Sequence, residues 1–179
     1  MDTTESSFKD HETATSAKIQ SLGFAIITLS DTRTEETDIS GAFIKNLLVN
    51  AGHTVPFYRV LPDDRVKIKD AVQDCLSDPH IAVIITNGGT GISSRDTTFD
   101  VVASLLEKRL EGFGELFRML SYQEIGPAAM MSRAVAGVAK GKVIFSVPGS
   151  TNAVRLAMEQ LILPQAAHVY WELHKHVLT

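Results

Sequence analysis

Three short runs of this chain are almost continuously apolar and rich in β-branched residues, a pattern typical of strands that are buried on both faces of a parallel sheet. They cover residues 23–29, 81–86 and 142–147. A fourth strand is predicted over residues 54–61, where Pro56 favours an edge position because proline lacks the N–H that a central strand must donate. The chain is therefore expected to build its core around a sheet.

The segments between these strands carry apolar residues at helical spacing. The predicted helices cover residues 42–51, 65–77, 98–108, 113–124, 128–133 and a last region from residue 152 onward. Asp38 and Ser40 are both candidates to cap the first of these helices, and Pro164 is expected to kink or split the last. This alternation predicts an α/β fold, namely a three-layer α/β/α sandwich around a mainly parallel sheet in a single domain.

The first 20 residues differ in composition from the rest. They are rich in Thr, Ser, Glu, Asp and Lys and hold few large apolar side chains. Such a segment buries too little surface to offset its conformational entropy. We therefore predict a flexible N-terminal tail over residues 1–20 and one folded domain over residues 21–179.

The overall charge and hydropathy restrict the class of partner. The formal net charge is −4, and 44% of the residues are apolar. Proteins that bind nucleic acid usually have a basic balance, so DNA and RNA are not expected as partners. No apolar run reaches the length of a membrane span, and the polar, acidic start does not have the pattern of a signal peptide. The single cysteine, Cys75, is expected to be a small buried side chain. These features predict a cytoplasmic protein that does not associate with a membrane.

Polar or glycine-rich segments follow three of the predicted strands. They are Ser30-Asp31, the loop from Asn87 to Gly91, and Pro148-Gly149-Ser150. In open α/β sheets, ligands bind at the carboxyl ends of the strands. The three segments are therefore expected to lie together at a binding site.

The loop Asn87-Gly88-Gly89-Thr90-Gly91 supplies three glycines and a hydroxyl group directly after a strand. Glycines leave backbone N–H groups open to a phosphate, and a following helix N-terminus favours an anion. The sequence contains neither the Gly-Lys-Ser/Thr of a P-loop nor the Gly-x-Gly-x-x-Gly of a dinucleotide site at this place. A tight turn that needs positive φ angles explains the glycines equally well. Spacing alone leaves both interpretations open.

Charged residues near this loop have two interpretations each. Arg95 could clamp a phosphate, and Asp96 together with Asp63 could hold a magnesium ion. Either aspartate could instead cap the helix that follows it. Arg133, after Ser132, could pair with a phosphate or form a structural ion pair.

Four ordered motifs resemble one protein family. The motifs are the glycine loop followed by Arg95-Asp96-Thr97-Thr98, the stretch from Glu111 to Arg118, Ser132-Arg133-Ala134, and Val147-Pro148-Gly149-Ser150. They are similar to the molybdopterin-binding MoaB/MogA-type proteins, which include the molybdopterin adenylyltransferases. The resemblance covers about residues 20 to 175, and the stretch from Phe117 to Gly126 looks more like the MoaB branch.

The resemblance implies a trimer or a dimer of trimers. It implies that the terminal phosphate of molybdopterin sits on the glycine loop, and that magnesium and ATP are used. Asp63 and Asp96 match the two functionally important aspartates of the family. The residues that match its ligand-lining segments are Ser30, Asp31, Asp38, Ser40, Gly41, Gly88, Gly89, Thr90, Gly91, Ser132, Arg133, Pro148, Gly149 and Ser150.

The expected function is therefore transfer of AMP from ATP to the terminal phosphate of molybdopterin, with release of pyrophosphate. Two alternatives remain open from the sequence. The chain could be a non-catalytic molybdopterin-binding or handover protein of the MoaB branch. It could also be an α/β oligomer in which the glycine loop is only a turn.

Overall fold

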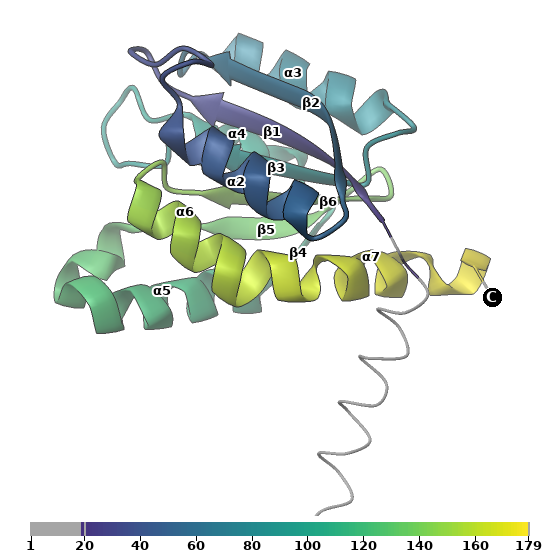
Figure 1. Cartoon of the computed structure of the whole chain (residues 1–179). Helices are drawn as coiled ribbons and strands as arrows, with labels where there is room; N and C mark the ends of the chain where they lie inside the picture. The colour runs from purple at the N-terminus through teal and green to yellow at the C-terminus, as the bar shows by residue number, and fades with distance from the viewer. Residues whose placement is uncertain (1–18, 20, 179) are drawn as a thin grey trace, which may run out of the picture.

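The computed structural model describes residue 19 and residues 21–178. All but one of the residues of the predicted N-terminal tail lie outside this range. The described chain forms a six-stranded sheet in the order β2-β1-β3-β6-β5-β4 (Figure 1). The strands β1 (Gly23–Leu29), β2 (Thr54–Leu61), β3 (Val83–Asn87) and β6 (Lys142–Val147) run parallel. The predicted edge position of the strand that contains Pro56 is confirmed, since β2 ends the sheet on one side.

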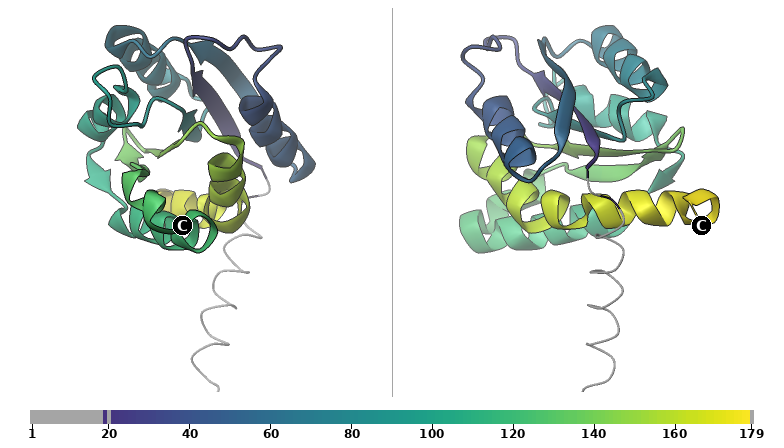
Figure 2. Two further views of the ribbon diagram at one scale, coloured as in Figure 1. Left: turned by 90° about the vertical axis from the view of Figure 1, so that its left-hand side faces the viewer. Right: turned by 45° about the vertical axis from the view of Figure 1, so that its right-hand side comes forward.

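Helices cover both faces of this sheet, which confirms the three-layer arrangement (Figures 1 and 2). One face packs against α2 (Ile39–Asn50), α5 (Glu111–Ile125), α6 (Thr151–Ala157) and α7 (Leu163–Leu178). The other face packs against α3 (Arg65–Ser77) and α4 (Thr98–Leu105). Each face has its own cluster of buried apolar side chains, because the side chains of a strand alternate between the two faces.

Two short strands were not predicted. β5 (Val135–Ala139) runs antiparallel to β6, and β4 (Lys108–Arg109) runs antiparallel to β5. The sequence of β5 is Val-Ala-Gly-Val-Ala, and alanine and glycine have low β-propensity, so this strand forms through pairing with β6. The helix predicted over residues 98–108 ends earlier, at Leu105, because Lys108 and Arg109 belong to β4.

Two predicted helical segments have other geometries. The helix expected over residues 128–133 is a 3₁₀ turn, η1, that covers Gly126–Met131. The C-terminal helical region is interrupted, as expected from Pro164, by a π turn, η2, over Met158–Ile162. Proline has no N–H to donate to the carbonyl four residues earlier, so the regular α-helical hydrogen bonding is interrupted here, and the π turn lies just before the proline.

Cys75 is buried on α3, as expected. Burial raises the pKa of its thiol to about 12, and the neighbouring charges of Asp74 and Asp78 act in the same direction. No helix within the described part of the chain is long and apolar enough to cross a membrane.

Candidate functional site

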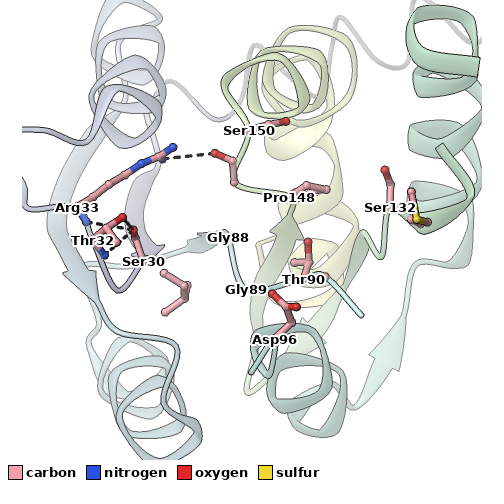
Figure 3. Close-up of a pocket in the computed structure, with 14 residues that line it drawn as sticks. Ser30, Thr32, Arg33, Gly88, Gly89, Thr90, Asp96, Ser132, Pro148 and Ser150 are labelled. Atoms are coloured by element: carbon pink, nitrogen blue, oxygen red, sulfur yellow. Dashed lines mark hydrogen bonds between the residues drawn. The ribbon is translucent and has the colours of Figure 1, made fainter. Parts of the chain in front are cut away.

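A cavity of about 450 Å³ opens at the carboxyl ends of β1, β3 and β6 (Figure 3). Its walls come from the three segments that follow these strands, together with Met131 and Ser132 at the end of η1. The predicted site residues that line it are Ser30, Gly88, Gly89, Thr90, Gly91, Asp96, Ser132, Pro148, Gly149 and Ser150. Segments separated by more than a hundred residues therefore meet at one opening, as the strand order requires.

Other predicted site residues lie behind this wall or at its rim. They do not line the cavity: Asp31, Asp38, Ser40, Gly41, Asp63, Asn87, Arg95 and Arg133. The structure gives most of these side chains partners within the protein.

The glycine loop has the backbone geometry of a tight turn. Gly88 has a φ of 101° and Gly89 a φ of 61°, in the left-handed region that side-chain-bearing residues rarely adopt. A Cβ atom on Gly88 would collide with the carbonyl of Leu29, and one on Gly89 would collide with Oδ2 of Asp63. The glycines are therefore needed for a tight turn with positive φ angles, and the same glycines also line the cavity.

Asn87 is the last residue of β3, and its side chain connects this strand with β1 directly before the glycine loop. Its Nδ2 donates to Oγ1 of Thr28 at 2.8 Å, and both side chains are buried. The side-chain carbonyl of Asn87 has no hydrogen-bond partner in the described part of the protein. This residue belongs to the sheet beneath the glycine loop.

Asp63 holds the segment before α4. Its Oδ1 accepts from the backbone N of Thr97 at 3.1 Å and from Oγ1 of Thr97 at 2.8 Å. Asp64, and not Asp63, caps α3 by accepting from the N–H groups of Val66 and Lys67. The capping alternative for Asp63 is therefore wrong.

Asp96 is the carboxylate that faces the cavity. Ser93 donates to its Oδ2 from the backbone N at 2.9 Å and from Oγ at 2.5 Å. These bonds are the main cause of a pKa below the ordinary value. The residue that caps α4 is Thr97, without a side-chain bond, so the capping alternative for Asp96 is also wrong.

Arg95 and Asp31 form an ion pair at the rim of the cavity. The distance from Nη2 of Arg95 to Oδ2 of Asp31 is 2.7 Å, and Oδ1 of Asp31 accepts from the backbone N of Asp63. The pair connects the loop after β1 with the loop after β3.

Arg133 is bonded to the backbone of the glycine loop. It donates to the carbonyls of Thr90, Gly91 and Asp96 and forms an ion pair with Asp100 at 3.2 Å. The ion-pair alternative for Arg133 is therefore found in the structure, and the guanidinium also holds the backbone of the loop.

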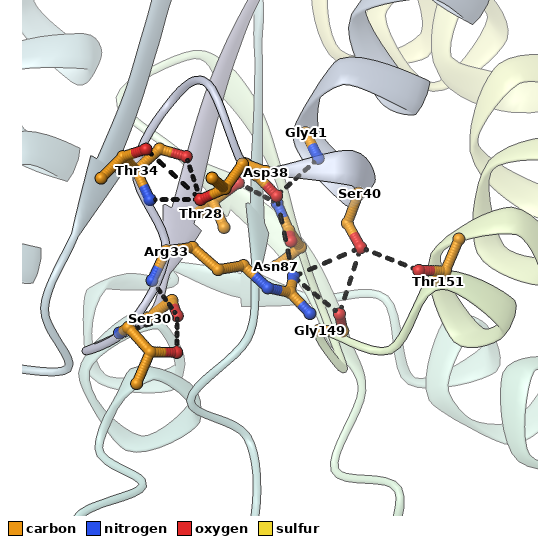
Figure 4. Close-up of polar contacts among 12 residues, drawn as sticks. Thr28, Ser30, Arg33, Thr34, Asp38, Ser40, Gly41, Asn87, Gly149 and Thr151 are labelled. Atoms are coloured by element: carbon orange, nitrogen blue, oxygen red, sulfur yellow. Dashed lines mark hydrogen bonds and ion pairs between the residues drawn. The ribbon is translucent and has the colours of Figure 1, made fainter.

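Asp38 and Ser40 lie at the start of α2, close to Arg33 and Gly149 (Figure 4). Asp38 caps α2 by accepting from the N–H of Gly41 at 3.0 Å, which decides between the two predicted caps. Oγ of Ser40 donates to the carbonyl of Gly149 at 3.2 Å and so connects α2 with the segment after β6.

Sequence reasoning missed Arg33, Thr32, Leu29 and Met131 as cavity-lining residues. Arg33 directly follows the predicted segment Ser30-Asp31, and its backbone N donates to Oγ of Ser30 at 3.2 Å. A cation at the end of a strand beside a glycine loop could have been identified from its position alone.

The described residues contain no group of three or more His, Cys, Asp or Glu side chains that could hold a metal ion by themselves. Magnesium does not need such a group, because it is usually bound by one or two carboxylates together with water and substrate phosphates. A single cavity carboxylate such as Asp96 fits that donor set.

Comparison with known proteins places this geometry in a family. A family model described as a probable molybdopterin binding domain matches residues 25–168. Molybdenum cofactor biosynthesis protein B of Bacillus anthracis is 53% identical over 151 residues, which cover 84% of this chain and 89% of that protein.

Solved structures give the same result. A crystal structure of a molybdenum cofactor biosynthesis protein B has a TM-score of 0.84 and 51% identity, covering 87% of this chain and 97% of that one. The tungsten cofactor synthesizing protein MoaB from Pyrococcus furiosus has a TM-score of 0.78 and 34% identity, covering 90% of this chain and 99% of that one. The resemblance inferred from the four motifs is thus confirmed, and the chain belongs to the family of probable molybdopterin-binding domains that includes molybdenum cofactor biosynthesis protein B.

Proposed function

We propose that this protein works in molybdenum cofactor biosynthesis and transfers AMP from ATP to the terminal phosphate of molybdopterin. The products are adenylyl-molybdopterin and pyrophosphate. The observation that carries the proposal is a single cavity lined by the glycine loop, by the Asp96 carboxylate and by Pro148–Ser150. Such a site can hold two phosphate groups next to each other, with the Asp96 carboxylate in the cavity wall beside them.

In this proposal the molybdopterin phosphate lies on the part of the glycine loop that follows Gly88, because the N–H of Gly88 donates to the carbonyl of Val147 at 3.0 Å. The hydroxyl groups of Thr90 and Ser132 lie close by. The nucleotide occupies the part of the cavity formed by Ser30 and Pro148–Ser150. Two observations support the division: the loop glycines line the cavity without side chains, and Ser30 lies across the cavity from Ser132 (Figure 3).

The reaction needs no nucleophilic side chain, because the attacking group is an oxygen of the molybdopterin phosphate. That oxygen forms a bond to the α-phosphorus of ATP, and the bond from this phosphorus to the pyrophosphate oxygen breaks. The protein has to align the two phosphates and screen their charge. Preorganised N–H groups and a fixed carboxylate are suited to this task.

Asp96 and Asp63 are the proposed magnesium-positioning residues. Oδ2 of Asp96 accepts from the backbone N and Oγ of Ser93, and Oδ2 of Asp63 lies beside Gly89. Bound magnesium would neutralise charge on the transferring phosphates. In the same proposal, Arg95 meets a phosphate at the rim in competition with Asp31, and Arg133 acts on the phosphate through the loop that it holds.

We also propose a homo-oligomer, a trimer or a dimer of trimers. Exposed apolar side chains on α5 and η1 support an assembly surface there, because monomeric proteins rarely expose such a group together. Its members are Leu116, Met119, Tyr122, Ile125 and Met130.

A second candidate is a molybdopterin-binding or handover protein without catalysis. One observation favours it: Asp63 is engaged by Thr97 and does not line the cavity. This candidate predicts molybdopterin binding without release of pyrophosphate.

The test is pyrophosphate release by the purified protein with molybdopterin, ATP and magnesium, and with each one left out. We expect turnover only with all three. Asp96→Asn should lower the rate on the order of a hundred- to a thousandfold while molybdopterin still binds. Asp70→Asn on α3 removes an equivalent charge away from the cavity and serves as the matched control. Binding of molybdopterin without any pyrophosphate release by the unaltered protein would replace the first candidate with the second.

A further inference from the structure

Three arginines near the glycine loop differ in where their guanidinium groups point. The donors of Arg133 are all directed at protein acceptors, namely three carbonyls and the Asp100 carboxylate. Arg95 is paired with Asp31 at the rim, and its side chain is 77% exposed. Arg33 is the one of the three that lines the cavity.

Arg33 is held along one edge of its guanidinium. Its Nη1 lies 3.5 Å from Oγ of Ser40, 3.5 Å from the carbonyl oxygen of Gly149 and 3.7 Å from Oδ1 of Asp38 (Figure 4). These contacts are long, which leaves the Nη1 group weakly bound by the protein. Within the described part of the chain, Nε and Nη2 have no hydrogen-bond acceptor.

The buried carboxylate of Asp38 helps to hold the Arg33 guanidinium in this position. The side chain of Asp38 is fully buried and accepts from the backbone N of Gly41 at 3.0 Å and from the hydroxyl of Tyr58 at 2.9 Å. Burial and this hydrogen bond raise the pKa of Tyr58, so the tyrosine stays a neutral donor. Asp38 therefore orients Arg33 without contacting the cavity itself.

Charge balance explains why a cation is needed at this place. Among the described residues that line the cavity, Arg33 and Asp96 are the charged ones. Two phosphate-bearing ligands would bring several negative charges next to Asp96. A guanidinium presents two parallel N–H groups, a geometry that matches the oxygens of a phosphate.

We propose that Arg33 binds the phosphate chain of the nucleotide, and that Asp38 and Ser40 are positioning residues for it. This inference rests on the proposed adenylyl transfer. The glycine loop supplies donors for the first phosphate, and Arg33 lies across the cavity from Ser132, beside Ser30 and next to Gly149 (Figure 3). The second phosphate-bearing ligand therefore meets Arg33.

The test measures binding of α,β-methylene-ATP with magnesium by isothermal titration calorimetry. Arg33→Gln should weaken binding on the order of tenfold to a hundredfold, because charge-assisted hydrogen bonds are lost. Arg33→Lys keeps the charge but lacks the two parallel N–H groups of the guanidinium, and it should give an intermediate affinity. Arg109→Gln removes an equal charge from β4 at the far edge of the sheet and should leave binding unchanged.

The salt dependence of the affinity gives a readout that a purely structural role would not change. Arg33→Gln should reduce its slope, and a thermal melt of each variant checks the fold. If Arg33→Gln and Arg33→Lys both bind the analogue as the unaltered protein does, the role of Arg33 is wrong and the proposed function stands. If Arg33→Gln weakens binding of molybdopterin but not of the ATP analogue, Arg33 does not bind the nucleotide and the inference is wrong. If the unaltered protein binds molybdopterin but not the analogue, adenylyl transfer fails, and the Arg33 inference fails with it.

Discussion

Arg133 donates from Nε to the backbone carbonyl of Thr90 at 3.0 Å, across 43 positions of sequence. Its Nη2 donates to the carbonyl of Gly91 at 2.6 Å, and the guanidinium lies over the ring of Phe99 at 4.7 Å. One side chain thus holds consecutive residues of the glycine loop. The shape of the loop depends on a residue that does not line the cavity.

Replacement of Arg133 by alanine should therefore loosen the glycine loop. We expect a loss of about 1–3 kcal/mol in the free energy of unfolding, because hydrogen bonds from a charged donor are lost and carbonyls lose their partner. Arg133→Lys should recover only part of this loss, since one ammonium cannot reach all three carbonyls. Urea denaturation measures the effect, with Arg109→Ala as the control. Equal stability of Arg133→Ala and the control would contradict the role.

Gly89→Ala should disturb the site directly. Gly89 has a positive φ, and a Cβ atom there would collide with Asp63 and Thr98. We expect molybdopterin binding to fall by at least tenfold and the protein to lose stability. Gly112→Ala is a matched control on α5, because a Cβ atom there meets nothing within 4 Å. The control should be neutral or slightly stabilising, and an equal loss of binding in both variants would contradict the prediction.

Ser93→Ala should raise the pKa of Asp96 toward its ordinary value. The two hydrogen bonds from Ser93 favour the ionised carboxylate, so the pKa of the folded protein lies below that of the unfolded chain. This contribution to stability is present above the unfolded pKa and is lost as the pH falls through the folded pKa. An NMR titration of Asp96 in both proteins provides the measurement. Ser93→Ala removes the hydroxyl donor and keeps the backbone N–H, so an unchanged titration midpoint would show that the Ser93 hydroxyl does not set the pKa.

Met130→Asp should reduce the size of the assembly. The side chain of Met130 is 81% exposed within one chain and lies beside other exposed apolar side chains of α5. Light scattering after size exclusion should show smaller species, because a buried unpaired charge disfavours association. Val66→Asp on α3 is the matched control on the opposite face of the sheet, and its side chain is also exposed. The assembly surface lies elsewhere if both variants keep the size of the unaltered protein.

The elements that were predicted well are those whose local pattern needs no partner. The strand Lys142–Val147 and the helix Arg65–Ser77 have the predicted bounds, since the first is an uninterrupted apolar run and the second starts after a capping aspartate. β5 and β4 could not be predicted in this way. β5 forms a strand because it pairs with the edge of β6, and β4 forms one because it pairs with β5.

The residues of the site divide in the same manner. Backbone-determined positions such as Gly88 and Ser150 line the cavity as expected, because parallel strands bring their carboxyl ends to one edge. The charged side chains were harder to assign. Arg133 was expected as a phosphate ligand or ion-pair partner, and Arg33 was not considered.

The sequence by itself determined the alternation of strands and helices, the glycine loop at the end of a buried strand, and the family. These features depend on local periodicity and on motifs within a few residues of each other. Only the tertiary structure decided which arginine faces the cavity and which aspartate caps a helix. A long charged side chain can reach several acceptors, and the acceptors of Arg133 and Arg33 come from segments that are distant in sequence and meet only after the sheet has formed.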